Sequence, residues 1–192
     1  MFEIDQFIAD CRASLTERGG AALQEVVART VADPAALFLA LGEPARPRLD
    51  LLFHDTDLTV FNVIWGPHQW TLPHNHNLRA VIGMYSGRED NIFWRRLPEA
   101  DLSRISAVGA KSLGRGDVTL LGRDIIHSVA NPLGRLSCAL HVYDGDFFAP
   151  GRSHWDPETL GEQPYDSAQV SPMFALATDP QIMAPHVLAV AR

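Results

Sequence analysis

The 192-residue sequence predicts one domain, residues 1–192, with a mainly β fold: a sandwich or small barrel of the jelly-roll kind behind a helical segment. Two observations predict it. From residue 49 onward, short apolar or β-branched runs alternate with turns rich in Gly, Asp and Pro. Before that point, apolar residues recur near the 3.6-residue period of a helix. We therefore divide the chain into a helical segment (1–42), a β-barrel core (47–148) and an irregular C-terminal wrap (149–192).

The helical segment predicts three helices. Gly19 and Gly20 interrupt the first one, and Pro34 is placed to open the third, which ends at Gly42. Two prolines exclude a helix from 43–48, so that stretch is a connector. One face of the first helix carries apolar residues at helical spacing: Phe2, Phe7, Ile8 and Cys11.

The barrel core predicts eight short strands bounded by turn residues. We expect them at 49–54, 59–65, 79–86, 91–97, 105–113, 118–120, 128–129 and 136–143. The absence of helical patterns between them favours a sandwich or barrel. After residue 144 the pattern fades, and we expect the remaining chain to wrap the barrel or to pair with its edge.

Charge and composition exclude several functions. The chain has 16 Lys and Arg against 23 Asp and Glu, a formal charge of −7, so we expect no nucleic acid and no anionic membrane surface as partner. No run approaches the ~20 apolar residues of a membrane span. The N-terminus has no signal pattern, and Cys11 and Cys138 are interpreted as reduced, buried thiols, with one disulfide as the alternative. These observations predict a cytoplasmic protein.

The histidines carry the chemistry. His74 and His76 lie two residues apart in a stretch that resembles a strand, so both side chains can project from one face. Two neutral imidazoles on one face are half of a site for Fe, Zn, Ni or Cu. The third ligand must come from elsewhere in the chain, and His127 is the candidate. The alternative is a pair of surface histidines on a loop.

These residues resemble the two motifs of the cupin superfamily over about residues 49–143. The resemblance implies a double-stranded β-helix, the jelly-roll barrel of that superfamily, and it implies that His74, His76 and His127 bind a metal. Many cupins add a glutamate ligand where this chain has Ala80 and Val81, so we expect three histidines and no carboxylate. The matching residues are Gly66, His74, His76 and Gly87 for the first motif, and Gly116, Asp117, His127 and Asn131 for the second.

A three-histidine shell is similar to that of the thiol dioxygenase branch, typified by cysteine dioxygenase, and to bacterial metal-dependent proteins of the same β-helix type. Residues 65–66 and 140–143 resemble segments of that branch, which implies that His141 and Tyr143 are a catalytic pair beside the metal. Arg48 is placed like the arginine that holds the substrate carboxylate, and Arg79 is its competitor. Ala139 replaces the serine that begins the branch's Ser-His-Tyr relay, and no cysteine stands near residue 81 for a cross-link to tyrosine.

The resemblance implies an Fe(II)-dependent enzyme, with Ni, Zn and Mn as alternative metals. Its partners would be O₂ and a small carboxylated thiol, whose sulfur is oxidised to a sulfinate. The alternative is a metal-binding cupin of another class, either a non-thiol metalloenzyme or a ligand-sensing module without turnover. An open pocket with a cation near the metal favours the dioxygenase, whereas a plugged pocket favours the sensor. We expect a monomer or a homodimer.

Overall fold

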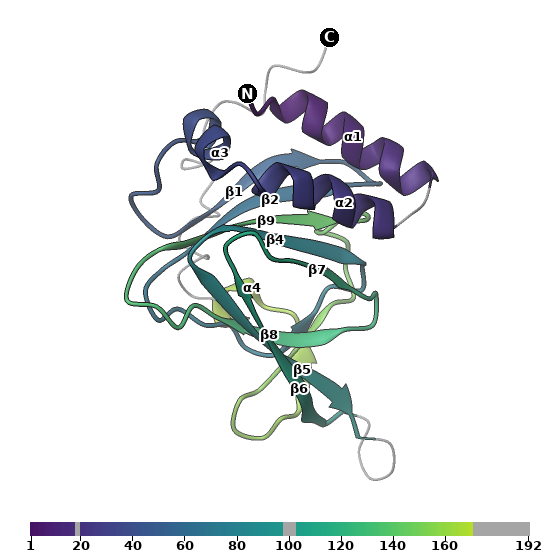
Figure 1. The fold of residues 1–192 in the computed structure, drawn as a ribbon. Coiled ribbons are helices and arrows are strands. Elements are labelled where there is room, and N and C mark those ends of the chain that lie inside the picture. Colours follow the sequence, from purple (N-terminus) through teal and green to yellow (C-terminus); the bar gives the residue numbers. More distant parts are fainter. Residues whose placement is uncertain (18–19, 98–102, 171–192) are drawn as a thin grey trace.

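The computed structural model describes residues 1–17, 20–97 and 103–170. Within these residues the predicted mainly β fold with N-terminal helices is confirmed (Figure 1). The helices are α1 (Ile4–Glu17), α2 (Gly20–Val31), α3 (Pro34–Leu41) and α4 (Ser167–Val170). The strands are β1 (Arg48–His54), β2 (Thr59–Trp65), β3 (His74–Asn75), β4 (Ala80–Ser86), β5 (Arg88–Arg96), β6 (Ile105–Gly114), β7 (Val118–Leu121), β8 (Ile126–Ala130), β9 (Ser137–Tyr143), β10 (Ser153–Trp155) and β11 (Glu162–Pro164).

The strands form two antiparallel sheets. In the described residues, sheet A has the order β1-β2-β9-β4-β7 and sheet B the order β11-β10-β3-β8-β5-β6. Few neighbours are consecutive in sequence, because the chain crosses repeatedly from one sheet to the other, as in a jelly roll. Apolar side chains from both sheets meet in one cluster inside the barrel, including Phe61, Ile82, Leu113 and Val129. The barrel core is therefore shared by both sheets.

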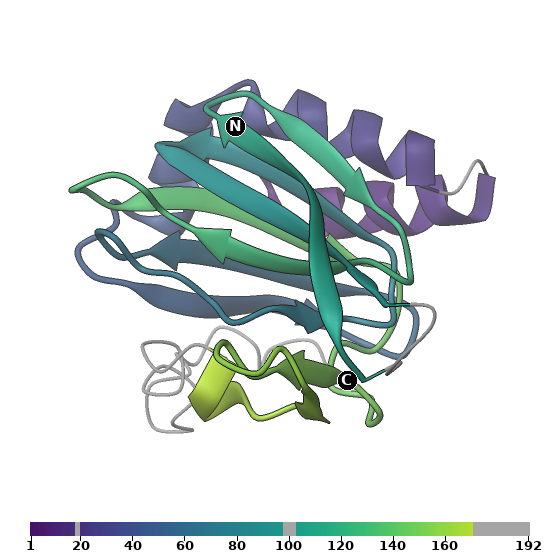
Figure 2. The same cartoon turned by 90° about the horizontal axis from the view of Figure 1, so that it is seen from below.

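Helices α1, α2 and α3 cover the outer face of sheet A (Figures 1 and 2). Val27 and Val31 of α2 pack in one buried cluster with Val81 of β4 and Leu140 of β9. The approach of α2 is close, because a Cβ on Gly83 would lie 2.5 Å from Cγ1 of Val27. Asp33 caps α3 by accepting a hydrogen bond from the amide of residue 36 (3.1 Å), as expected for a helix opened by proline. The central strands β2, β9 and β4 of sheet A are thus buried on both faces.

The C-terminal segment extends sheet B instead of leaving its edge free. Strand β10 pairs with β3 on one side and with β11 on the other. It lies with α4 on the side of sheet A that faces away from the helices (Figure 2). Residues 171–192 of the predicted wrap lie outside the described residues.

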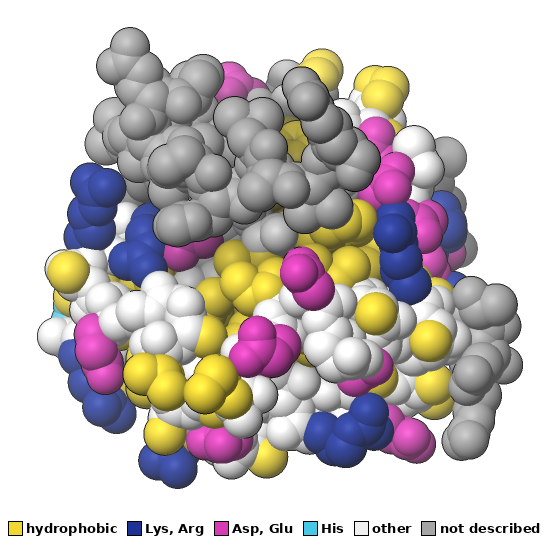
Figure 3. Space-filling model, turned by 90° about the horizontal axis from the view of Figure 1, so that it is seen from above, with side chains coloured by type: hydrophobic (Ala, Val, Ile, Leu, Met, Phe, Trp, Pro, Cys, Tyr) yellow, Lys and Arg dark blue, Asp and Glu magenta, His cyan; other side chains and the backbone are white. Residues whose placement is uncertain are grey.

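The charges on the outer surface, the helices and the two cysteines can be compared with what the composition predicts. Acidic and basic side chains are interspersed over the described part of the face in Figure 3. No described helix combines the length and the apolar character needed to cross a membrane. Cys11 and Cys138 are buried and free, and burial raises their pKa to about 12 and about 11, so both remain thiols at neutral pH.

Candidate metal centre

Strand register brings the three histidines together. His74 on β3 lies directly opposite His127 on β8, and opposite His154 on β10 on its other side. Directly paired residues of neighbouring strands project from the same face, so these three rings point into the barrel. His76 follows two residues after His74 and points the same way. His76 and His127 are 51 positions apart in the sequence, and the pairing of β3 with β8 brings them together.

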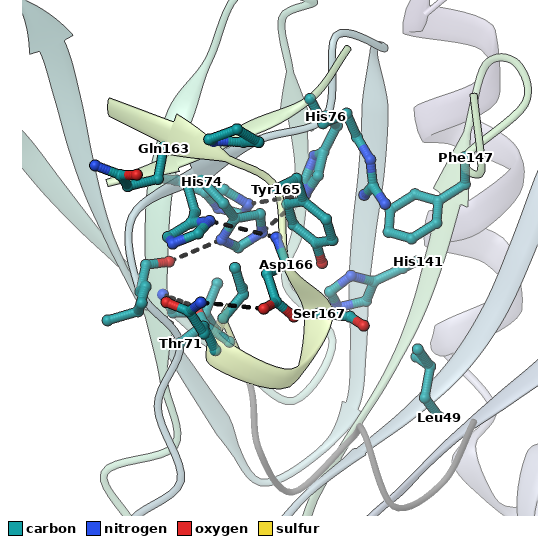
Figure 4. A pocket seen from close by; sticks show the side chains of 18 of the residues that line it. Leu49, Thr71, His74, His76, His141, Phe147, Gln163, Tyr165, Asp166 and Ser167 are labelled. Atoms are coloured by element: carbon teal, nitrogen blue, oxygen red, sulfur yellow. Dashed lines mark hydrogen bonds between the residues drawn. The ribbon is translucent and has the colours of Figure 1, made fainter. Parts of the chain in front are cut away.

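The Nε2 atoms of the triad (His74, His76 and His127) converge on one point (Figure 4 shows His74 and His76). Nε2 of His76 lies 3.1 Å from Nε2 of His74 and 3.3 Å from Nε2 of His127. Two nitrogens that each lie about 2.1 Å from one ion, at angles of about 90–110°, are roughly 3.0–3.4 Å apart. The two spacings from His76 therefore fit one divalent metal ion.

Hydrogen bonds on the far side of two rings set their tautomers. Nδ1 of His74 donates to the carbonyl oxygen of Leu72 (2.8 Å), and Nδ1 of His127 donates to Oδ1 of Asn91 (2.7 Å). Both Nε2 atoms then carry lone pairs. Nδ1 of His76 is buried and has no hydrogen-bond partner among the described residues. The Nε2 lone pairs of His74 and His127 therefore both face Nε2 of His76, an arrangement that a bound cation would stabilise.

Burial also keeps the triad neutral. It lowers the pKa of His74 to about 4, and the pKa values of His76 and His127 fall well below the usual value. The charged form of each imidazole is disfavoured because it would lose its hydration. Neutral imidazole is the form that binds a metal, so the site is ready for one at neutral pH. Among the described residues, no carboxylate joins this group of ligand atoms.

A buried carboxylate nevertheless lies behind the triad. Glu89 on β5 is fully buried and accepts hydrogen bonds from Nε1 of Trp65 (2.8 Å) and Nδ2 of Asn91 (3.0 Å). Asn91 in turn accepts from the ligand His127. The amide of Asn91 therefore links the charge of Glu89 to a metal ligand. Glu89 is not among the converging ligand atoms, and it supports the ligand His127 through Asn91.

The same carboxylate holds His141. Nε2 of His141 lies 3.2 Å from Oε2 of Glu89, and its Nδ1 lies 3.3 Å from Oη of Tyr143. Since Glu89 accepts at Nε2, Nδ1 of His141 is left to accept the hydroxyl hydrogen of Tyr143. The Tyr143 ring lies 4.9 Å from that of His76, and burial raises the pKa of Tyr143, so it stays protonated. The pair inferred from the resemblance thus lies beside the triad.

Other motif residues shape the turns. Gly87 has φ +76°, and a Cβ there would lie 2.2 Å from Oγ of Ser137, so the β4–β5 turn needs glycine. Nδ2 of Asn131 donates to the carbonyl oxygen of Gly66 (2.8 Å), and Oγ of Ser137 donates to Oδ1 of Asn131 (3.0 Å). The Asn131 side chain thus joins the second motif to Gly66 of the first.

The triad opens into a cavity of about 1160 Å³. One wall is apolar and comes from sheet A, with Leu49, Leu51, Phe61 and Val63. The opposite wall is more polar and comes from the C-terminal segment, where Gln163, Tyr165, Asp166 and Ser167 are found (Figure 4). A ligand in this cavity would have the three histidines, His141 and Tyr143 within its lining.

The structure brings neither predicted arginine to the cavity. Nε of Arg48 donates a hydrogen bond to Asp50, which also accepts one from the side chain of Asn62. Asn62 in turn accepts a hydrogen bond from Tyr85, which belongs to the buried cluster between the helices and sheet A (the helix-side cluster). Arg79 pairs with Asp144 (Nε to Oδ2, 2.7 Å). Neither arginine is among the described residues that line the cavity. Each is held by a carboxylate of its own chain.

Arg152 lies in the cavity instead. Its guanidinium stacks between the rings of Phe147 and Tyr165, which approach the rings of His76 and His74 respectively. Sequence reasoning missed Arg152 and its neighbours because they lie in the segment interpreted as irregular. It also missed Glu89 and Asn91, although their signal is visible: on β5 polar Glu89 and Asn91 are buried while apolar Ile92 is exposed, the reverse of the usual strand pattern.

No family model matches the chain, and no curated protein matches it. Among solved structures it is similar to a single-substitution variant of oxalate decarboxylase from Bacillus subtilis (TM-score 0.39, 20% identity, 50% of this chain and 23% of that chain). It is also similar to oxalate decarboxylase from the same organism at pH 4.6 (TM-score 0.39, 17% identity, 57% of this chain and 24% of that chain). The chain spans about a quarter of the length of these enzymes.

Proposed function

We propose that this protein is an Fe(II)-dependent dioxygenase that adds both atoms of O₂ to the sulfur of a small carboxylated thiol. The net reaction is RSH + O₂ → RSO₂⁻ + H⁺, in which sulfur loses four electrons and O₂ gains them. The observation that carries the proposal is the convergence of three neutral Nε2 atoms without a carboxylate, beside a buried His–Tyr pair. Bound Fe(II) would supply the redox chemistry between a thiolate and O₂.

His74, His76 and His127 would hold the metal. Because all three ligands are neutral, the ion would keep its full charge and would favour a thiolate over a thiol. Only three protein ligands are present in the described residues, so positions remain for substrate and O₂. Asn91 and Glu89 fix the orientation of His127.

Tyr143 and His141 provide a path for the thiol proton. The Tyr143 hydroxyl donates its hydrogen to Nδ1 of His141 and exposes oxygen lone pairs that can accept the S–H hydrogen. A proton passed through Oη to Nδ1 would make His141 an imidazolium, and the carboxylate of Glu89 at Nε2 would stabilise that charge. The buried pair would thus act as the base that prepares the substrate.

The cavity supports an enzyme over a sensor without turnover. A sensor of the kind considered predicts a plugged pocket, whereas this cavity has room for a ligand and contains a cation, Arg152. The metalloenzymes to which the chain is similar at the level of fold are oxalate decarboxylases, and their substrate is not carried over to this chain.

The test is O₂ consumption by anaerobically Fe(II)-loaded protein supplied with a panel of small thiols. We expect O₂ uptake and sulfinate formation in a 1:1 ratio for at least one carboxylated thiol, and neither with His76→Ala. Protein that binds Fe(II) stoichiometrically and yet consumes no O₂ with any thiol would remove the proposal.

A further inference from the structure

The side of the cavity made by β1 and β2 is a continuous apolar surface. Leu49 lies directly opposite Val63, and Leu51 lies directly opposite Phe61. Directly paired residues, and residues two apart on one strand, share a face of the sheet, so these four side chains adjoin one another inside the barrel. All four line the cavity and form what we call the apolar wall (Figure 4 shows Leu49). Among the described lining residues, β1 and β2 contribute no charged side chain.

The apolar wall begins beside the pair formed by His141 and Tyr143. Phe61 lies directly opposite His141 on the neighbouring strand, and its ring lies 6.1 Å from the ring of Tyr143. The Tyr143 ring in turn lies 4.9 Å from the ring of His76, a ligand of the triad. One aromatic ring therefore separates the apolar wall from the triad. A ligand that places one atom at the triad has the rest of its body within reach of Phe61.

The apolar wall also keeps surface that water can reach. Phe61 and Val63 are almost fully buried, whereas Leu49 and Leu51 are partly exposed although they pack against the cluster inside the barrel. The cavity has a volume of about 1160 Å³, and cavities that bury a drug-sized ligand are about 300–1,000 Å³. A short-chain thiol would leave most of this space, and both leucines, to water. A larger apolar group would cover them, and the removal of apolar surface from water is favourable.

We propose that the apolar wall is the subsite for the substituent of the thiol, and that the preferred substrate is an arylalkyl thiol rather than a short hydrophilic one. The sulfur would lie at the triad, and the ring would extend past Phe61 to Leu49 and Leu51. The wall offers no partner to a carboxylate, so the acid group of the substrate would lie elsewhere in the cavity. The placement of sulfur at the triad rests on the proposed function, whereas the binding of an apolar ring to the wall does not.

The binding test uses the full chain loaded with redox-inert Zn(II) and two sulfur-free probes, 3-phenylpropan-1-ol and propan-1-ol, in calorimetric titrations. We expect the phenyl probe to bind about 10- to 100-fold more tightly, because its ring is removed from water against the apolar wall. Equal affinities for the two alcohols would overturn the subsite. With Fe(II)-loaded protein, kcat/KM for 2-phenylethanethiol should exceed that for 2-mercaptoethanol by a similar factor.

Variants locate the preference at the wall. Leu51→Gln and Leu49→Gln each place an amide on a partly exposed position of the wall, and each should reduce the preference for the phenyl probe about 10-fold. Leu51→Met keeps an apolar side chain and should retain most of the preference. Leu39→Gln is the matched control, because Leu39 lies on α3, is 75% exposed and does not line the cavity. Zinc stoichiometry and circular dichroism verify the fold of each variant. An unchanged preference in both Leu51→Gln and Leu49→Gln would contradict the proposal.

Failure of this inference and failure of the proposed function give different results. If the phenyl probe binds through the apolar wall but no thiol drives O₂ uptake, the subsite stands and the dioxygenase reaction does not. If 2-phenylethanethiol and 2-mercaptoethanol are oxidised with equal kcat/KM, and Leu51→Gln alters neither value, the reaction stands and the subsite does not.

Discussion

The two faces of strand β9 show how one segment can serve stability and chemistry at once. Cys138, Leu140 and Val142 point toward the helices and belong to the helix-side cluster. His141 and Tyr143 point into the barrel and line the cavity. Every residue of the strand is buried, so burial alone does not distinguish the faces. The distinction is chemical: the helix face is apolar, whereas the cavity face carries polar groups that each have a partner.

The same alternation explains the position of Arg48. On β1, Leu49 and Leu51 line the cavity, while Arg48 and Asp50 alternate with them and project from the other face. A shift of one residue along a strand exchanges the faces. The spacing between Arg48 and His74 in the sequence therefore suggested a substrate-binding role. The Arg48 side chain, however, lies on the face of the sheet that points away from the cavity.

The largest expected effect is the loss of metal from the cavity face. His76→Ala removes one of three ligands, so metal affinity should fall by more than the roughly 10- to 100-fold that loss of an outer partner costs. Metal content after dialysis and Zn(II) titration measure it, with circular dichroism as the control for folding. Full metal stoichiometry in this variant would show that the triad is not the site.

On the helix face of the same strand, Leu140→Ala should act on stability alone. Leu140 is fully buried, so the truncation should lower the free energy of unfolding by about 2–5 kcal/mol. Denaturant titration measures that loss. Zn(II) affinity of the folded protein should match the wild type, and a parallel fall in affinity would mean that the two faces are not separable.

A smaller effect is expected for Glu89, which supports the residues around the metal site without being a ligand itself. Glu89→Gln keeps the shape but replaces one acceptor oxygen by a donor, so it cannot accept from Trp65, Asn91 and His141 together. We expect kcat to fall about 10- to 100-fold with metal retained. Asp90→Asn is the matched control, since Asp90 lies next to Glu89 in sequence and pairs with Arg88 outside the barrel. Equal losses in both variants would argue against a specific role of Glu89.

The smallest effect tests the face of β1. Arg48→Gln removes a partly exposed ion pair with Asp50 and should cost about 0–1 kcal/mol of stability. Because Arg48 lies outside the cavity lining, KM for a carboxylated thiol should stay at the wild-type value. A tenfold rise in KM would return Arg48 to the substrate site.

Sequence patterns predicted the elements well where local chemistry decides them. The strand Thr59–Trp65 and the helix Pro34–Leu41 have the predicted bounds, because turn residues and a proline mark their ends. The triad could be predicted because its residues sit in two recognisable motifs. Arg152 could not be, because its position depends on β10 pairing with β3, a contact between segments nearly 80 residues apart. Glu89 and Asn91 required the register of β5 against β8.

The most direct test of the central claim, that the triad and the His141–Tyr143 pair oxygenate a thiol, is a turnover under ¹⁸O₂ in ordinary water. The account predicts a sulfinate that carries two ¹⁸O atoms, and no product from His76→Ala. A product without ¹⁸O, or a disulfide in place of the sulfinate, would contradict it.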